Sequence, residues 1–467
     1  MKRLALVVLA LASLFPATAR AHVGSPDVYY EGAAGPYRML VTVRPPDAVP
    51  GIAEVSARVA EPIEAGARMT MVPLPARGIG AKLSPVPDVA RRDRDDTQTF
   101  VGHLWLMQTG PWQVRLHVDG ARGTGELAVP VPALPARSKT MSTALGLGLF
   151  ALLLLLAFGA ISIAGAGARD AGLARGREPT SADRWRGVRA RVIAAVVVVV
   201  ALVGGRLWWN AEASDYARYV YKPLQLGAHV DGAGTLALQL QDPGWLRWRR
   251  VDDLVPDHGH LMHLYVVREP AMDRVWHLHP EATGAGAFRF ALPAMPAGRY
   301  RLYGDVVHAT GLAETAVAEL DVPEIAGAPL GGDDAAGPTP AHLVWLHDAH
   351  EPLRAKKPTW FRFQLQDDAG APEPLEPYMG MLGHAAFIRR DGSVFAHVHP
   401  SGSVPMAALT TLEGAPSNPH AGHVMAPNGA TEVAFPYGFP RAGDYRIFVQ
   451  VKRAGRIETG AFDAHVE

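Results

Sequence analysis

Two histidine-rich segments in the C-terminal half of the chain carry the side chains best suited to chemistry. The first contains His258, His260 and His263 and ends in a His-x-His-Pro pattern at His277 and His279. Imidazole nitrogens at this density are natural ligands for Cu(II), Zn(II) or Ni(II). The first segment therefore predicts a nitrogen-rich metal site.

The second segment repeats the first with one change of chemical type. His384 takes the position of His263, and His397 and His399 form a second His-x-His-Pro pattern. Met379 and Met381 stand where the first segment has its two leading histidines. The exchange of imidazole for thioether keeps a lone pair for a soft metal, above all copper, and the thioether version favours Cu(I). We therefore predict copper, as Cu(I) or Cu(II), with zinc as the alternative cofactor.

Each segment is expected to fold as a β-hairpin that brings its histidines together. A register centred on residue 270 places His263 opposite His277, and one centred between residues 390 and 391 places His384 opposite His397. Directly opposed residues have Cβ atoms about 5 Å apart, close enough for two imidazoles to share one ion. The plainer alternative is that these are structural or solvated histidines. The sequence leaves open whether the hairpins form one shared site.

Two further groups are candidate metal ligands. An insertion over residues 401–430 contains His420, His423 and Met425, which we interpret as a capture loop. His22 would be the mature N-terminus and could chelate copper through its α-amine and imidazole. The plainer interpretation is that His22 simply follows a cleavage site.

Composition narrows the classes of function. The 467 residues include 45 basic and 45 acidic side chains and no Cys. Balanced charge gives no electrostatic reason to expect nucleic acid as a partner, and a metal site without Cys cannot be thiolate-based. The sequence contains no Gly-rich phosphate loop, no Gly-x-Ser-x-Gly elbow and no His-Glu-x-x-His pattern. We therefore expect a binding protein and not an enzyme.

Three apolar runs predict how the chain meets a membrane. Residues 1–21 have the basic start, apolar middle and small-x-small end of a secretory signal peptide. Residues 143–167 and 192–209 are predicted transmembrane helices. The positive-inside rule puts the arginine-rich segment 168–191 in the cytoplasm. Both flanking regions are then periplasmic, which predicts a bacterial inner-membrane protein with the lipid bilayer as one partner.

The regions outside these spans predict β-structure. Short alternating stretches separated by turn signals indicate β-sandwich domains over residues 22–140, 220–325 and 341–467. The last two look like copies of one unit, because each closes with a similar pattern around Tyr300 and Tyr445. The predicted fold class is mainly β, with three immunoglobulin-like β-sandwich domains plus two transmembrane helices.

The outer domains also resemble known families. The stretches His22–Glu31 and Gly123–Val131 are similar to FixH/YtkA-like periplasmic β-sandwich domains. The hairpin Val394–Pro400 resembles those of uncharacterised exported membrane proteins rich in His and Met. The resemblance implies immunoglobulin-like sandwiches and, for some members, a link to copper or to the assembly of respiratory oxidases.

Taken together, these features predict a membrane-anchored periplasmic metal-binding protein for copper storage, tolerance or delivery. A respiratory oxidase or a metal transporter would be the partner. One alternative is a non-metal assembly or interaction scaffold for a respiratory or transport membrane complex, in which the histidine pairs would be dispensable. Another is an enzyme with a copper brace at His22.

Overall fold

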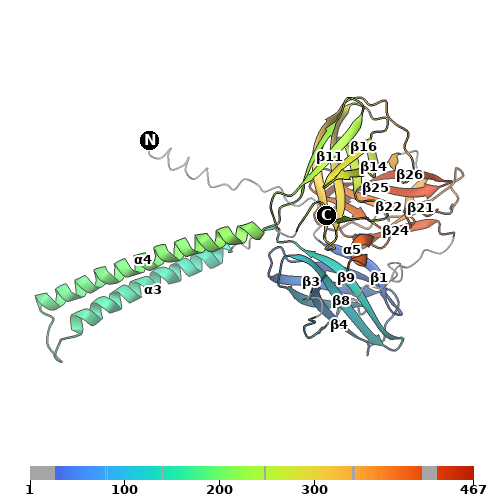
Figure 1. The fold of residues 1–467 in the computed structure, drawn as a ribbon. Coiled ribbons are helices and arrows are strands. Elements are labelled where there is room, and N and C mark those ends of the chain that lie inside the picture. Colours follow the sequence, from blue (N-terminus) through green and yellow to red (C-terminus); the bar gives the residue numbers. More distant parts are fainter. Residues whose placement is uncertain are drawn as a thin grey trace. The chain divides into compact units, whose positions relative to one another are not determined.

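A computed structural model describes residues 27–78, 80, 83–137, 141–246, 249–338, 342–348, 350–412 and 429–467. The chain forms two compact units, one from the described parts of Met1–Ala136 and Tyr221–Glu467 and one from Arg137–Val220 (Figure 1). The predicted signal peptide, His22 and the loop residues His420, His423 and Met425 lie outside the described residues.

The smaller unit is a pair of helices, α3 (Thr143–Asp170) and α4 (Ser181–Tyr219), which run side by side in Figure 1. Both are long and apolar enough to cross a membrane, so they indicate a membrane anchor. Helix α4 begins inside the arginine-rich segment 168–191, before the predicted second span, because Thr180 and Asp183 form a capping box that starts the helix there. It also continues past the predicted apolar span.

The first sandwich comes from the N-terminal part of the chain and consists of two antiparallel sheets. Along β3 the buried residues alternate with more exposed ones, as the two-residue period of a strand requires. One sheet has the order β1 (Val28–Ala34), β2 (Tyr37–Arg44), β3 (Gly51–Val59), β7 (Thr99–Leu106) and β6 (Arg91–Arg92). The other has the order β5 (Asp88–Val89), β4 (Arg68–Pro75), β8 (Gly110–Gly120) and β9 (Gly123–Ala133).

The next sandwich, called repeat one, has two leaves that join through a single parallel pair, Gln225 with Val317. Its outer leaf has the order β15 (Glu281–Gly284), β16 (Ala287–Ala291), β11 (Thr235–Gln241) and β10 (Gln225–Val230). Its inner leaf has the order β18 (Ala313–Val322), β17 (Gly298–His308), β13 (His263–Glu269), β14 (Val275–Leu278) and β19 (Ala335–Gly337), and β12 (Leu254–Val255) also pairs with β17.

The last sandwich, called repeat two, has the same order of strands in its inner leaf. That leaf has the order β26 (Arg456–Val466), β25 (Gly443–Arg453), β22 (His384–Arg389) and β23 (Phe395–Val398). The outer leaf has the order β20 (Leu343–Trp345), β21 (Thr359–Leu365) and β24 (Glu432–Tyr437), and a short helix α5 spans Met406–Thr410. The predicted fold class is confirmed: sandwiches of antiparallel sheets plus two long apolar helices.

The inner leaves of the two repeats share an apolar cluster. Tyr265 and Tyr303 of repeat one pack with Phe395 and Phe448 of repeat two. The Tyr303 and Phe395 rings stack with centroids 4.4 Å apart. Each large side chain buried in this way contributes about 1.5–3 kcal/mol, so this cluster holds the two histidine-bearing hairpins against each other.

The first sandwich packs on the loop that follows His399. Backbone hydrogen bonds join Glu31 to Ser401 at 2.7 Å and Ser403 to Tyr29 at 2.9 Å. Gly402 has φ +116° there, and a Cβ on it would lie 2.0 Å from the Tyr29 oxygen, so only glycine allows this close approach. The contact fixes the chain next to the second His-x-His pair.

Candidate metal centre

The hairpins of the two repeats pair in a register two residues away from the predicted one. Tyr265 pairs with His277, and Ala386 pairs with His397, so the predicted direct pairing of His263 with His277 and of His384 with His397 is wrong. The reason is the shape of the turns: a backbone hydrogen bond from Arg268 to Arg274 closes the first one. A shift of two keeps every side chain on its predicted face, so the histidines still meet, as diagonal neighbours.

The two repeats contribute their histidines to one shared cluster. Nδ1 of His263 lies 3.1 Å from Nε2 of His277, and Nδ1 of His384 lies 3.2 Å from Nε2 of His397. The His263 and His397 rings, from different repeats, have centroids 5.3 Å apart. The question that the sequence left open is thereby answered: the hairpins face each other across the interface.

Three groups of side chains in this cluster have the composition and spacing to hold a metal ion, and in each group the ligand atoms all lie within 4.8 Å of one another. Group A is His263, His277 and His397; group B is His384, His397 and His399; group C is Asp257, His258 and His399. Groups A and B consist of imidazoles alone, whereas group C adds a carboxylate. The structure therefore supports metal binding and does not by itself select the metal.

Hydrogen bonds at the outer ring nitrogens turn lone pairs toward the centre of group A. His263 Nε2 donates to the Asp257 carbonyl oxygen at 3.0 Å, and His277 Nδ1 donates to Gln450 Oε1 at 2.8 Å. In the neutral ring the other nitrogen then carries a lone pair, so His263 Nδ1 and His277 Nε2 present lone pairs to each other at 3.1 Å. Such a pair is stabilised by a cation that both nitrogens can bind.

Each repeat orients a histidine of the other. Gln450, whose side chain receives the His277 proton, is the strand partner of His384 in repeat two. Asp305 holds the equivalent position opposite His263 in repeat one, and its carboxylate lies 3.4 Å from His397 Nδ1. The crossed contacts make the centre a property of the interface, since neither repeat alone supplies both the ligands and the residues that orient them.

Burial keeps the histidines of the cluster neutral. It lowers the pKa of His277, His384 and His397 well below the ordinary value, and neighbouring imidazoles lower it further. Burial likewise lowers the pKa of His263 to about 4. Burial raises the pKa of the Asp305 carboxyl to about 7. Neutral imidazoles retain the lone pairs that a metal needs at neutral pH.

Three further predicted ligands, His279, His260 and Met381, belong to none of the three groups. His279 Nε2 is 3.3 Å from His263 Nδ1, and Asp334 accepts from its Nδ1 at 3.0 Å, so this histidine also points a lone pair inward. His260 stacks on His279 with ring centroids 3.9 Å apart. Met381 packs against the apolar core that includes the first sandwich.

The turns that carry the His-to-Met exchange have the same backbone in both repeats. His258 and Met379 each have φ of 50°, followed by a glycine with positive φ. Paired backbone contacts close the turns, Asp257 with His260 and Tyr378 with Met381. The exchange therefore occurs at equivalent places in space. A metal role for Met379 and Met381 stays a prediction.

The sequence interpretation missed the residues that orient or complete the ligands: Asp257, Asp305, Asp334 and Gln450. Asp257 directly precedes His258, the first histidine of its segment, so the sequence could have identified it as a candidate ligand. Asp305 and Gln450 stand in strands far along the chain from the histidines they contact, so no local motif marks them.

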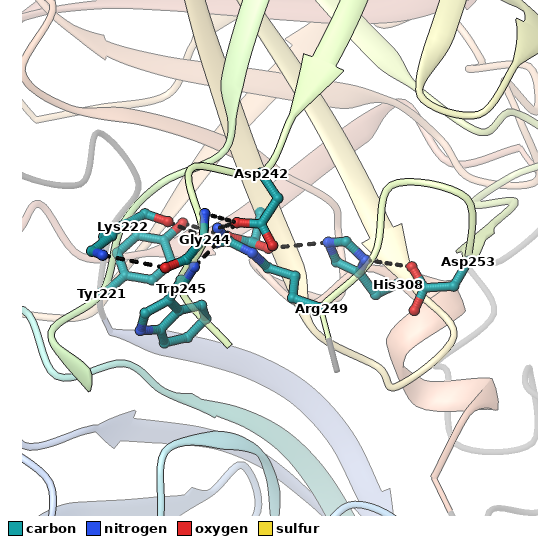
Figure 2. Close-up of polar contacts among 9 residues, drawn as sticks. Tyr221, Lys222, Asp242, Gly244, Trp245, Arg249, Asp253 and His308 are labelled. Atoms are coloured by element: carbon teal, nitrogen blue, oxygen red, sulfur yellow. Dashed lines mark hydrogen bonds and ion pairs between the residues drawn. The ribbon is translucent and has the colours of Figure 1, made fainter. Parts of the chain in front are cut away.

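A further buried histidine lies outside the cluster, in a network of charged groups shown in Figure 2. His308 contacts the Asp253 carboxylate at 2.7 Å and the Glu314 carboxylate at 3.0 Å. Glu314 also accepts from Arg249 at 2.9 Å and from the Tyr221 hydroxyl at 2.7 Å. Burial lowers the pKa of His308, but the two carboxylates outweigh it and the pKa is raised. This ring is stabilised as a cation.

Comparison with known proteins adds a domain match and a likeness of fold. The domain of unknown function DUF8832 matches residues 222–324 and 342–467, which hold the two repeats. No curated protein matches the chain. Similar solved structures include the Lin-41 filamin domain, with 19% identity over 28% of this chain and 97% of that one at a TM-score of 0.18. The FN1–FN3 domains of chicken CNTN1 have 8% identity over 91% and 97% of the two chains at a TM-score of 0.14. These likenesses concern the fold alone.

Proposed function

We propose that this chain is a membrane-anchored metal-binding protein that binds copper where its two repeats meet. The observation that carries the proposal is group A, in which His263 and His277 of one repeat and His397 of the other converge. Hydrogen bonds at the outer nitrogens of His263 and His277 direct inward the lone pairs that ligate the ion. Ligands from both repeats also join the repeats to each other when metal binds.

The donor chemistry favours copper over zinc. Group A offers three neutral nitrogens and no carboxylate, so an ion of low charge is buried there at a smaller electrostatic cost than a divalent one. Cu(I) is the common biological ion of that kind that prefers imidazole and thioether ligands. Thioethers stand at the turn of repeat two, at Met379 and Met381.

The physiological role that we propose is copper storage, tolerance or delivery at the outer face of a bacterial inner membrane. The arginine-rich connection between the two apolar helices supports an orientation with both flanking regions in the periplasm. Binding and transfer need no catalytic group, and we propose no reaction. A respiratory oxidase or a metal transporter is the proposed recipient.

The test is metal titration of the full-length protein in detergent. We would measure affinity for Cu(I), Cu(II) and Zn(II) by chelator competition and compare the native chain with the double variant His277→Phe/His397→Phe. Phe keeps a planar ring in the space and removes the ligand nitrogens. His103→Phe is the matched control, because His103 is exposed on β7 of the first sandwich.

We expect tight Cu(I) binding that the double variant loses and the control keeps. Zinc binding that is tighter than Cu(I) binding and is lost in the double variant would contradict the choice of metal. Weak binding that is equal in all three proteins would contradict metal binding altogether and favour an assembly scaffold.

A further inference from the structure

The three ligand groups overlap in a way that limits how ions fill them. Group B shares His397 with group A and His399 with group C, whereas groups A and C have no residue in common. Each side chain offers one ligand atom to a group. Groups A and C can therefore be filled at the same time, but group B competes with both.

Group C differs from the other two in charge. The Asp257 carboxylate is buried, with 5% of the residue exposed, and within the described residues it forms an ion pair with His258. Asp257 Oδ1 accepts the backbone N–H of Ala407 at 2.8 Å, which fixes the carboxylate. A buried carboxylate requires a cation nearby, and in the part of the chain that the structure describes no Lys or Arg lies within 4.0 Å of this one.

The distances in group C suit a bound ion better than a direct contact. Asp257 Oδ2 and His258 Nε2 are 4.0 Å apart, which is too long for a hydrogen bond. Two ligand atoms that each lie about 2 Å from one metal ion stand about 3–4 Å apart. The third ligand, His399, comes from repeat two, and its ring centroid lies 5.0 Å from that of His258.

The equivalent place in the other half of the pseudo-symmetric cluster has different chemistry. Tyr378 stands at the position of Asp257 and Met379 at that of His258. His279, the counterpart of His399, already contacts Asp334. The carboxylate and the imidazole of the turn thus occur together in repeat one, and the second repeat lacks both.

We propose that Asp257, His258 and His399 form a second metal site, specific for a divalent cation, which is filled at the same time as group A. This proposal rests on the proposed metal-binding function. The Asp257 carboxylate offsets part of the charge of a divalent ion, which three neutral imidazoles cannot do. Group C therefore takes Zn(II) or Cu(II), while group A takes copper. His384 lies between the two sites: its ring centroid is 5.4 Å from that of His258 and 5.4 Å from that of His397.

The experiment counts ions in the full-length protein. Detergent-purified protein is loaded with Zn(II) alone, passed through a desalting column, and its zinc per chain is measured by mass spectrometry of the elements. The variants are Asp257→Asn, which keeps the acceptor for Ala407 but removes the charge, and His258→Gln in case the first fails to fold. Asp273→Asn, at an exposed carboxylate of the first hairpin turn, is the control.

We expect one zinc ion in the native chain, in the control and in His277→Phe/His397→Phe, and none in either group C variant. Cu(I) added afterwards should bind to the native chain at group A without displacing that zinc ion. One ion in the native chain that Asp257→Asn leaves in place would overturn the second site and leave the proposed function intact. One ion that is lost from both kinds of variant would overturn it in favour of a single shared site. No bound ion in the native chain, with copper as well as with zinc, would overturn the proposed function itself.

Discussion

The cluster between the repeats and the network around His308 both bury imidazole rings, but they surround them differently. His277 and His397 lie among other imidazoles, and burial lowers their pKa values. His308 lies between two carboxylates, and its pKa is raised although the ring is fully buried. A protonated ring between two carboxylates has no lone pair to offer a metal. Burial alone therefore does not distinguish a candidate ligand from a structural histidine, whereas the number of carboxylates that contact the ring does.

The two regions also differ in how a mutation in each is expected to affect the stability of the protein. In the network of Figure 2, charges are buried in compensating pairs, so the loss of one leaves another unpaired. In group A of the cluster the rings are neutral, and the loss of His277 leaves Gln450 without a hydrogen-bond donor. We therefore expect mutations in the network to act on stability and mutations in the cluster to act on metal binding.

The largest effect on stability is expected from Glu314→Ala. Glu314 is the shared acceptor of Arg249, His308 and Tyr221, and its side chain is fully buried. Its removal leaves buried positive charge and should lower the free energy of unfolding by about 3–5 kcal/mol. Urea unfolding followed by tryptophan fluorescence measures this, and metal bound per folded chain should be unchanged.

The control for this variant is Glu319→Ala on the same strand. Glu319 pairs with Arg299 and Arg301 at the surface, where about a third of its side chain is exposed. Surface pairs contribute about 0–1 kcal/mol. Equal losses in the two variants would mean that the network is not the stabilising feature described above.

The same substitution in both regions sharpens the contrast. His277→Phe removes a ligand atom. Copper affinity should therefore fall by more than the factor of about 10–100 that is typical when a residue hydrogen-bonded to a ligand is replaced. Stability should fall by only about 1–3 kcal/mol, because Gln450 loses a hydrogen-bond donor. His308→Phe should do the reverse, with copper affinity retained and stability lowered, because Asp253 and Glu314 lose the charged ring between them. The measurements are chelator competition and urea unfolding on each variant. A His308 variant that loses copper affinity while folded would break the comparison.

A smaller effect is expected behind the ligands, at Gln450. Gln450→Leu removes the acceptor that holds the His277 ring in place, so copper affinity should fall about 10–100-fold. Gln450→Glu keeps an acceptor at that point and should retain most of the affinity. If the Leu and Glu variants bind copper equally well, Gln450 has no part in positioning the ligand.

The fold class and the meeting of the histidines could be predicted from the sequence, for related physical reasons. Alternating apolar residues set the faces of the strands, and the two-residue period kept His263 and His277 on one face even though their predicted register was wrong. The register itself depends on the turn, where Met272 has a φ of 50°. A positive φ is uncommon for a residue other than glycine, so the sequence of the turn does not predict this conformation. The capping box at Thr180 was readable but was missed, so the start of α4 was misplaced.

The shared nature of the site could not be predicted. It depends on contacts between strands of different repeats, such as His277 with Gln450, and those depend on how two sandwiches pack. Group C was missed for the same reason, since His258 meets His399 only across that interface. The resemblance to FixH/YtkA-like domains, the identity of the metal and the physiological partner stay predictions.

The smallest effect expected is the pH dependence of the network's stability. Because the pKa of His308 is raised above its ordinary value of 6.5, the charged ring contributes its full stabilisation below that value. The contribution is lost as the pH rises through the higher pKa of the folded state. The difference in unfolding free energy between the native chain and His308→Gln should therefore shrink from pH 6 to pH 9, whereas the corresponding difference for the exposed His103→Gln should stay near zero. A difference for His308→Gln that grows with pH would mean that the ring is neutral in the folded protein, and the two regions would then differ in position but not in charge.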